Sequence, residues 1–244
     1  MIMFSPDDFA SFTRRPRLSL RDDLADLHAE LYPLLRARRF DLHPPRDGDP
    51  LVVEPRALRL AYAKAETVLR WMQREFGAEW GEWARQATLG IRLDARGLSV
   101  ELDLADTARV DAQNFHDKVR YGSPEKLHLR QMLAELGGAY AFVVSEAAPT
   151  DANLFARREL FRARCSRLVN LGVLNEAWAR VEPGAHALTL ATTFPPDDAR
   201  LASEALVPAL AYSLRHLYPL YQFAAWSPRN DFIRRPRADA QRES

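Results

Sequence analysis

The sequence predicts an α+β protein, mostly helical and built around a small, largely antiparallel sheet. Three observations point to this class. Leucines recur at helical spacing over long segments, residues 88–104 alternate apolar and polar side chains as a β-hairpin does, and strands and helices do not alternate strictly along the chain. Without strict alternation, a doubly wound parallel sheet is disfavoured.

Two helices are expected near the N-terminus. Residues 5–12, SPDDFASF, predict a short helix capped by Ser5 or Asp7. A longer amphipathic helix is expected from about residue 19 to residue 38, and Pro33 is expected to bend or tighten its last turn. Its apolar face is formed by Leu20, Leu24, Leu27, Leu31 and Leu34 or Leu35.

The next part of the chain contains the strongest strand signal. Residues 43–50, HPPRDGDP, are typical of a loop, and LVVE at 51–54 predicts a short strand. A helix is expected over 55–76, because proline suits the first turn of a helix. Residues 88–104, TLGIRLDARGLSVELDL, predict a hairpin with one buried face and a turn at DARG.

The C-terminal half is expected to be mainly helical. Two helices are predicted over 105–122 and 123–138, and a third over 150–172, ending at Gly172. A last long helix is expected over 197–226, with breaks at Pro208 and Pro219; strands are predicted over 138–145 and 186–194. With no linker visible, residues 1–233 are expected to form one domain, followed by a mobile polar tail at 234–244.

Composition narrows the functional classes. The chain has 244 residues and a formal net charge of +1, with 34 basic residues against 33 acidic ones. Nucleic-acid binding is therefore possible but not favoured, because it needs many cations facing phosphates. Acidic residues near the start and the lack of a long apolar run predict a soluble cytoplasmic protein without a signal peptide or membrane span.

The single cysteine, Cys165, excludes an intramolecular disulfide and a cysteine-cluster metal site. We interpret it as a small buried side chain rather than a catalytic thiolate. No glycine-rich phosphate loop occurs, so we expect no cofactor and no metal. The oligomeric state stays open.

Residues 111–130, DAQNFHDKVRYGSPEKLHLR, form the densest polar stretch and the alternative site of chemistry. Ser123 and Lys126 match a Ser-x-x-Lys spacing, although a serine helix cap explains the same residues better. Glu125 and His128 match half of a di-iron motif whose second half is absent. In the hydrolase alternative, His116 is the base and Lys118, Arg120 or Lys126 stabilises an anion; its candidate residues are His116, Asp117, Lys118, Ser123 and Lys126.

The predicted hairpin carries carboxylates that are compatible with two interpretations. Glu101, Asp103 and Asp94 are compatible with a magnesium-dependent nuclease, in which paired carboxylates hold the ion. The favoured interpretation places them on a solvent-exposed face, because polar residues alternate with leucine in such a strand.

Arginines supply the candidate anion- or partner-binding surfaces. FTRRPR at 12–17 has a near copy, FIRRPR, at 232–237, and the predicted helix over 150–172 is rich in arginine. A solvated face paired to glutamates explains that helix without a partner. The candidate binding residues are Arg14, Arg15, Arg17, Arg157, Arg164, Arg167, Arg234, Arg235 and Arg237. LYPL also occurs twice, at 31–34 and 217–220, which leaves a duplication open.

Several segments resemble the YktB-like group of uncharacterised bacterial proteins. FSPDDFASF followed by LSLRDDLADLHAELYPLL looks like the start of that group, and TLGIRLDARGLSVELDL and LRHLYPLYQFA are similar in placement. The resemblance implies an α+β fold and no known activity, so it transfers no catalytic residue.

The leading functional hypothesis is a non-catalytic binding module that meets an anionic ligand or a protein partner through arginine-bearing surfaces. The hydrolase centred on residues 111–130 is the alternative. Tyr221, Phe223 and Trp226 are compatible with an interface near the C-terminus, although their helical spacing favours the core.

Overall fold

A computed structural model describes residues 2–13, 19–44, 49–54, 56–121, 123–147 and 158–233, with only the backbone of Tyr121 and Ser123. Several predictions lie outside these residues. They are the mobile tail at 234–244, part of the loop at 43–50, and the candidate binding residues Arg14, Arg15, Arg17, Arg157, Arg234, Arg235 and Arg237.

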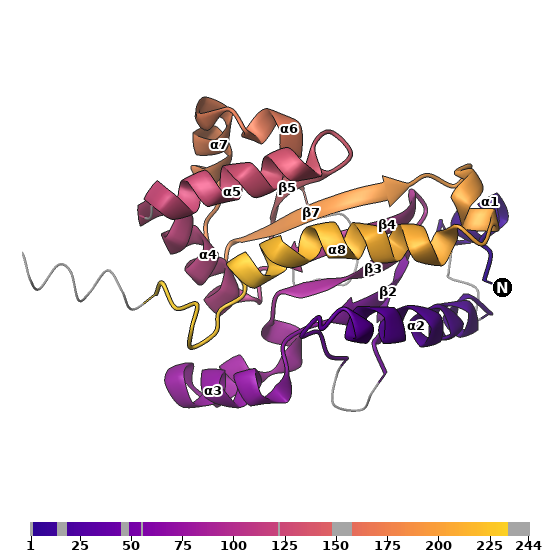
Figure 1. The fold of residues 1–244 in the computed structure, drawn as a ribbon, viewed down its shortest axis with the longest axis horizontal. Coiled ribbons are helices and arrows are strands. Elements are labelled where there is room, and N and C mark those ends of the chain that lie inside the picture. Colours follow the sequence, from indigo (N-terminus) through magenta and orange to yellow (C-terminus); the bar gives the residue numbers. More distant parts are fainter. Residues whose placement is uncertain are drawn as a thin grey trace, which may run out of the picture. The chain divides into compact units, whose positions relative to one another are not determined.

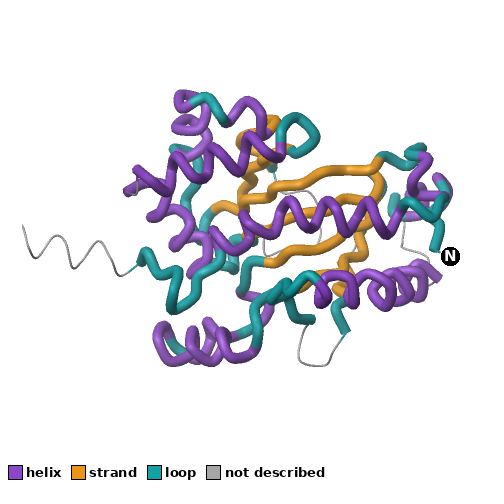
Figure 2. The backbone as a smooth tube through the Cα atoms, in the orientation of Figure 1, coloured by secondary structure: helices purple, strands orange, loops and turns teal. Residues whose placement is uncertain are grey.

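The predicted α+β class is confirmed: helices accompany a seven-stranded sheet with the strand order β1-β2-β3-β4-β7-β5-β6 (Figures 1 and 2). The pairings of β1 with β2, β2 with β3, and β5 with β6 are antiparallel. The strands are β1 (Leu51–Glu54), β2 (Ala57–Tyr62), β3 (Thr88–Asp94), β4 (Gly97–Leu104), β5 (Ala141–Glu146), β6 (Glu159–Arg164) and β7 (His186–Phe194).

The α-helices are α1 (Pro6–Ser11), α2 (Ser19–Ala37), α3 (Glu66–Phe76), α4 (Arg109–Tyr121), α5 (Ser123–Leu136), α6 (Cys165–Leu168), α7 (Leu171–Trp178) and α8 (Leu206–Ala224). Short 3₁₀ segments are η1 (Ala78–Gly81), η2 (Trp83–Arg85) and η3 (Ala199–Ala202). No helix in the described part of the chain is long and apolar enough to cross a membrane.

Contacts group the chain into two compact units. Unit 1 comprises Met1–Lys64, Thr88–Leu102 and Ala191–Tyr218, and unit 2 comprises Ala65–Ala87, Asp103–Leu190 and Pro219–Ser244. The single domain expected over residues 1–233 stays a prediction.

In unit 1, α2 packs on β1 and β2. The helix confirms the apolar pattern predicted for it, since Leu20, Leu24, Leu27, Leu31 and Leu35 are all buried. Leu34, offered as an alternative to Leu35, is instead 42% exposed. Pro33 lies inside the helix without ending it.

In unit 2, Met72, Val110 and Trp226 form a buried cluster, against which Phe76, Trp80 and Ile233 pack. The Trp226 ring meets Phe76 edge-on at 5.1 Å between centroids. Tyr221 is buried as well, so Tyr221 and Trp226 are core residues, as their spacing favoured.

The helix predicted over 55–76 is wrong in its first half. Residues 57–62 are β2, which pairs with β1 on one side and β3 on the other, and α3 begins only at Glu66. Every residue of β2 is buried. A strand covered on both faces gains so much from burial that the helix preference of its alanines and leucines is overridden.

The helix predicted over 150–172 is also wrong where it is described. Residues 159–164 form β6, which pairs with β5, and only the short α6 follows. Gly172 lies in the first turn of α7 instead of ending a helix, because Asn170 caps that helix by accepting the N–H groups of Gly172 and Val173.

The last long helix begins later than predicted. α8 starts at Leu206, after η3. Pro208 stands in its first turn, where a main-chain N–H needs no partner in the helix, and Pro219 lies inside the helix. Neither proline breaks the helix.

The hairpin at 88–104 is confirmed as β3 and β4, but the prediction of one buried face is wrong. All eight residues of β4 are buried, including Ser99, Glu101 and Asp103. The polar face is stabilised by pairing: Glu101 Oε1 lies 2.8 Å from Arg59 Nε. Burying a charge costs less free energy when the charge is paired or hydrogen-bonded in this way.

Candidate partner-binding site

The polar stretch at 111–130 places a buried polar stripe on one face of α4. Asp111, Asn114 and Lys118 follow one another at helical spacing, and they are 0%, 0% and 5% exposed. The Asp111 carboxylate accepts the N–H of Ala87 and the N–H of Trp226, each at 2.7 Å. Asp111, the first residue of this stripe, therefore holds two separate main-chain segments of unit 2.

Asn114 binds the last residue of α8 and the segment that follows it. Its Nδ2 donates to the Ala224 carbonyl at 3.2 Å, and its Oδ1 accepts the Phe232 N–H at 2.8 Å. An asparagine side chain offers both a donor and an acceptor, so one buried amide can hold two points of a chain.

Lys118 completes the stripe. Its Nζ donates to the Phe223 carbonyl at 2.9 Å and to Asn230 Oδ1, and it lies 4.1 Å from the Phe223 ring centre and 4.8 Å from that of Phe232. Main-chain, amide and ring contacts together compensate the desolvated ammonium group. This lysine serves the packing of the C-terminal segment.

The other residues of the hydrolase hypothesis are dispersed. His116 Nδ1 lies 3.3 Å from Oδ1 of its neighbour Asp117, which also accepts Gln113 Nε2 at 2.8 Å. Lys126 Nζ lies 3.3 Å from Asn175 Oδ1 on α7. The Ser123 side chain lies outside the description, so a Ser123–Lys126 pair stays a prediction.

His128, the histidine of the half di-iron motif, stacks on the Phe223 ring at 5.7 Å between centroids with an interplanar angle of 8°. In the part of the chain that the structure describes, histidine, cysteine and carboxylate side chains form no group of three able to hold a metal ion.

The arginines predicted to share one helix lie on different elements. Arg164 is in β6 and donates to the Gly138 carbonyl at 2.9 Å, whereas Arg167 is in α6. On β6, Arg162 pairs with Glu159 at 2.7 Å, and the preceding Arg158 pairs with Glu146. A binding role for Arg164 and Arg167 stays a prediction.

The carboxylates weighed as a magnesium site are held by arginines and a threonine. Asp94 lies 2.7 Å from Arg96 and 3.1 Å from Arg92, while Asp103 accepts Thr189 Oγ1 at 3.2 Å. Burial tends to raise the pKa of Asp94, but hydrogen bonds from Arg96 and the charges of Arg96 and Arg92 outweigh it and hold that pKa below its usual value. Asp94 and its two arginines therefore form an ion-pair network in which the negative charge is neutralised.

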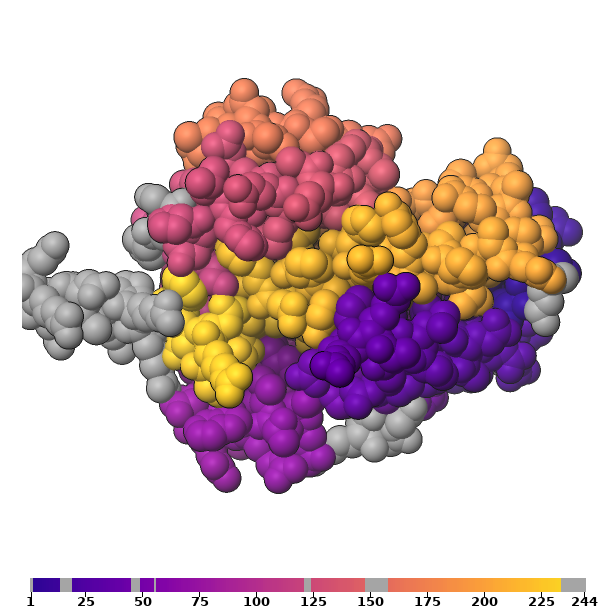
Figure 3. All heavy atoms as spheres, in the orientation of Figure 1, coloured from indigo at the N-terminus to yellow at the C-terminus, as the bar shows by residue number. Residues whose placement is uncertain are grey.

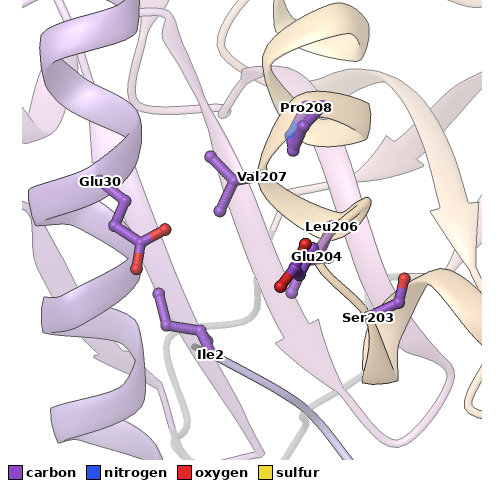
Figure 4. A pocket seen from close by; sticks show the side chains of 7 residues that line it. All are labelled: Ile2, Glu30, Ser203, Glu204, Leu206, Val207 and Pro208. Carbon is purple, nitrogen blue, oxygen red and sulfur yellow. The ribbon is translucent and has the colours of Figure 1, made fainter.

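A pocket of about 340 Å³ opens in unit 1 between α2 and the start of α8 (Figure 4). Ile2 and Leu206 are buried in its wall, and the exposed side chains of Glu30 and Glu204 stand at its rim. Figure 4 shows the Glu30 carboxylate directed away from its helix toward the hollow, with Glu204 on the opposite side. The lining residues are Ile2, Glu30, Ser203, Glu204, Leu206, Val207 and Pro208.

α2 and the Leu206–Tyr218 part of α8 run side by side in the same direction (Figures 1 and 3). Glu30 meets Val207 at the pocket, and further along both helices the Tyr218 ring stacks on Phe40 at 4.1 Å between centroids. The Tyr218 hydroxyl also accepts the Asp41 N–H at 2.8 Å. The pocket thus lies at the N-terminal end of α8, and the Tyr218 contacts hold the two helices together further along.

The segments that line the pocket also carry three exposed apolar side chains. Met3 follows Ile2, Leu34 lies one helical turn after Glu30, and Tyr212 lies one turn after Pro208. They are 48%, 42% and 62% exposed. The α2–α8 site denotes the pocket together with Met3, Leu34 and Tyr212.

Acidic residues precede the pocket along α2. Asp22, Asp23 and Asp26 lie before Glu30, and Asp8 of α1 is close enough to act on Asp23. Burial first, and then the charges of Asp8, Asp26 and Asp22, raise the pKa of Asp23. We call these four aspartates and Glu30 the acidic sector.

A scan of protein-family models and a search of curated proteins find no match to this chain. The YktB-like resemblance therefore stays a prediction.

The α2–α8 site was not found by sequence reasoning. Glu30, Glu204 and Tyr212 come from separate segments and belong to no motif. Leu34 and Leu35 fitted the apolar face of α2 equally well, so nothing in the sequence indicated that the Leu34 side chain is exposed.

Proposed function

We propose that this protein acts by binding a protein partner rather than by catalysis, and that the partner docks at the α2–α8 site. One observation carries the proposal: a pocket lined by apolar and acidic side chains lies between two helical segments that also carry the exposed apolar side chains of Leu34 and Tyr212, one helical turn from the lining residues Glu30 and Pro208. Exposed apolar side chains that gather around a concavity, within a polar rim, are typical of protein interfaces.

Tyr212 is the residue we expect to contribute most. Its ring is held against His216, one turn further along α8, with centroids 4.1 Å apart. A tyrosine offers a large contact area with few rotatable bonds, so little conformational entropy is lost when a partner covers it.

The contacts at residues 111–130 lend the hydrolase alternative no support. Lys118, one of its charged groups, donates to the Phe223 carbonyl and is 5% exposed. A general acid or an anion-stabilising group must reach substrate. The alternative stays a prediction.

Photo-crosslinking tests the proposed site in cells that naturally produce the protein. Benzoylphenylalanine replaces Tyr212 or, as a control, Leu127 of α5, which is 55% exposed and belongs to unit 2. The crosslinked protein is identified by mass spectrometry, purified and titrated against this chain. We expect a partner that crosslinks from position 212 only.

Truncations then measure the contribution of the site to the affinity for that purified partner. Tyr212→Ala and Leu34→Ser are expected to weaken binding by about 10-fold or more each, because truncating a central interface residue costs about 2 kcal/mol. Leu127→Ser serves as the control and is expected to leave the affinity unchanged. Equal affinities for all variants, or no saturable complex, would contradict the proposal.

A further inference from the structure

Resting on the proposed function, we infer that the pocket of the α2–α8 site receives an arginine or lysine side chain from a segment of the partner. The aliphatic stem of that side chain packs on Ile2, Leu206 and Val207. Its charged group lies between the carboxylates of Glu30 and Glu204, which reach the hollow from α2 and from the segment before α8 (Figure 4).

The chemistry of the lining selects this occupant. Arginine and lysine combine an apolar stem with a terminal cation, and they bury the stem along apolar surface while keeping the charge at a polar rim. Carboxylates at that rim form charge-assisted hydrogen bonds with the cation. An anionic side chain would be repelled by both glutamates, and an apolar one would leave them without a new partner.

Ser203 of the lining and Arg200, three residues before it, do not offset these charges. The Ser203 hydroxyl donates to the Arg200 carbonyl at 3.2 Å and accepts the Ala205 N–H at 3.3 Å. The Arg200 guanidinium binds both oxygens of Asp198, at 2.9 and 2.6 Å, and lies over the Phe194 ring. Its charge is thus already matched by Asp198.

The acidic sector supplies an independent electrostatic argument. Burial first, and then the charges of Asp8, Asp26 and Asp22, raise the pKa of Asp23. The three neighbouring carboxylates are therefore close enough to Asp23 to interact with it electrostatically. Asp26 lies one helical turn before Glu30 on α2, so the negative charge of the cluster extends toward the pocket and there attracts a cationic segment and repels an anionic one. A cationic occupant here is a different ligand from the anion expected at the arginine-bearing surfaces, which stays a prediction.

A peptide array provides the test. Seven-residue peptides with random flanks carry arginine, lysine, citrulline, leucine or glutamate at the centre, and the labelled full-length protein is bound to them. Citrulline keeps the shape of arginine and lacks its charge. We expect the strongest peptides to carry arginine or lysine, and the best arginine peptide to bind at least about 10-fold more tightly than its citrulline twin.

Glutamine variants locate the effect. Glu30→Gln and Glu204→Gln are each expected to weaken the arginine peptide several-fold and to leave the citrulline peptide unchanged. Glu79→Gln, which alters an exposed glutamate of η1 in unit 2, is the matched control and is expected to change neither. Raising the salt concentration is expected to weaken binding of the arginine and lysine peptides and to leave binding of the citrulline peptide unchanged.

The outcomes separate this inference from the proposed function. If citrulline or leucine peptides bind as tightly as arginine peptides, or if both glutamine variants bind normally, the basic occupant is wrong. If Leu34→Ser still abolishes peptide binding in that case, the proposed docking site is retained. Agmatine binding as tightly as the best peptide would assign the pocket to a small cation instead. If no peptide distinguishes the wild type from a Leu34→Ser/Tyr212→Ala variant, both proposals fail.

Discussion

The carboxylate of Asp111 joins two main-chain N–H groups that are far apart in the sequence, those of Ala87 and Trp226. The side chain is 0% exposed, and both hydrogen bonds are 2.7 Å long. Together with Asn114 and Lys118, it makes α4 the support on which the C-terminal segment of unit 2 is fixed.

Replacing Asp111 is therefore expected to be strongly destabilising. Asp111→Ala should lower the free energy of unfolding by about 3 kcal/mol or more, because each buried N–H left without a partner costs about 1 to 3 kcal/mol. Urea denaturation followed by tryptophan fluorescence measures the change. Glu135→Ala, at an exposed position of α5, is the control and should stay within about 0.5 kcal/mol of the wild type. Similar midpoints for both variants would contradict this role.

A second prediction concerns the buried ion pair of Arg59 and Glu101 and its effect on the free energy of unfolding. Their side chains are 11% and 8% exposed, and Arg59 also donates to Thr88 Oγ1 at 2.6 Å. Glu101→Ala should lower the free energy of unfolding by about 3 to 5 kcal/mol, because it removes the partner of a buried cation. Urea denaturation measures this loss.

The double variant Arg59→Met/Glu101→Leu tests the cause. It removes both charges while keeping the volume, so it should recover most of the loss seen in Glu101→Ala. A double variant as unstable as the single one would show that packing, rather than the unpaired charge, is responsible.

Sequence predicted α2 because that helix has one exposed and one buried side. The leucines of α2 repeat at helical spacing against an acidic outer face, and α2 occurs as predicted. β2 could not be predicted in this way, because both of its faces are covered and its alanines also suit a helix.

At β6 the prediction of a helix was wrong for a different reason, namely the exposure of much of the strand. It is the last strand in the sheet order, and Glu159, Arg162 and Arg164 are exposed. Without a strict alternation of buried and exposed residues, its leucine and arginines fit a helix equally well. Charged side chains on an edge strand also discourage pairing with another sheet, which explains why arginine is suitable there.

The candidate site was less predictable than the fold. The polar residues at 111–130 were a correct signal that something polar gathers on α4, but sequence cannot tell a buried structural stripe from a catalytic one. Asp111, Asn114 and Lys118 take their role from Phe223, Trp226 and Phe232, which only the folded chain brings to them.

Cys165 is buried, as interpreted from sequence, and it should react slowly. Burial raises the pKa of its thiol to about 12, so very little thiolate is present near neutral pH. Iodoacetamide at pH 8 should modify the native protein about 100-fold or more slowly than the protein in guanidinium chloride. Mass spectrometry of timed samples measures both rates, and comparable rates would contradict the burial.

Gly90 in β3 should tolerate no side chain. A Cβ built there would lie 2.0 Å from the Leu60 carbonyl oxygen of the paired strand β2. Gly90→Ala should therefore force the strands apart and lower the free energy of unfolding by about 2 kcal/mol or more. Gly138→Ala is the matched control, since its nearest contact is 3.8 Å away at Ser166 Oγ, and an equal loss in both would argue against the clash.

His28 makes the stability of unit 1 depend on pH. Its Nδ1 lies 2.8 Å from the Tyr62 hydroxyl, whose pKa is raised by burial and by Tyr32, so that hydroxyl keeps its proton and can donate it to a neutral imidazole. Burial lowers the pKa of His28 below its ordinary 6.5, although Asp49 opposes the shift. The unfolded chain therefore binds a proton at a higher pH than the folded one does. The stabilising contribution is fully present above pH 6.5 and is lost as the pH falls through the ordinary pKa toward the lowered one. Urea midpoints should decrease between pH 7.5 and pH 5.5, and less so in His28→Gln; an identical decrease in the variant would rule out this histidine as the source.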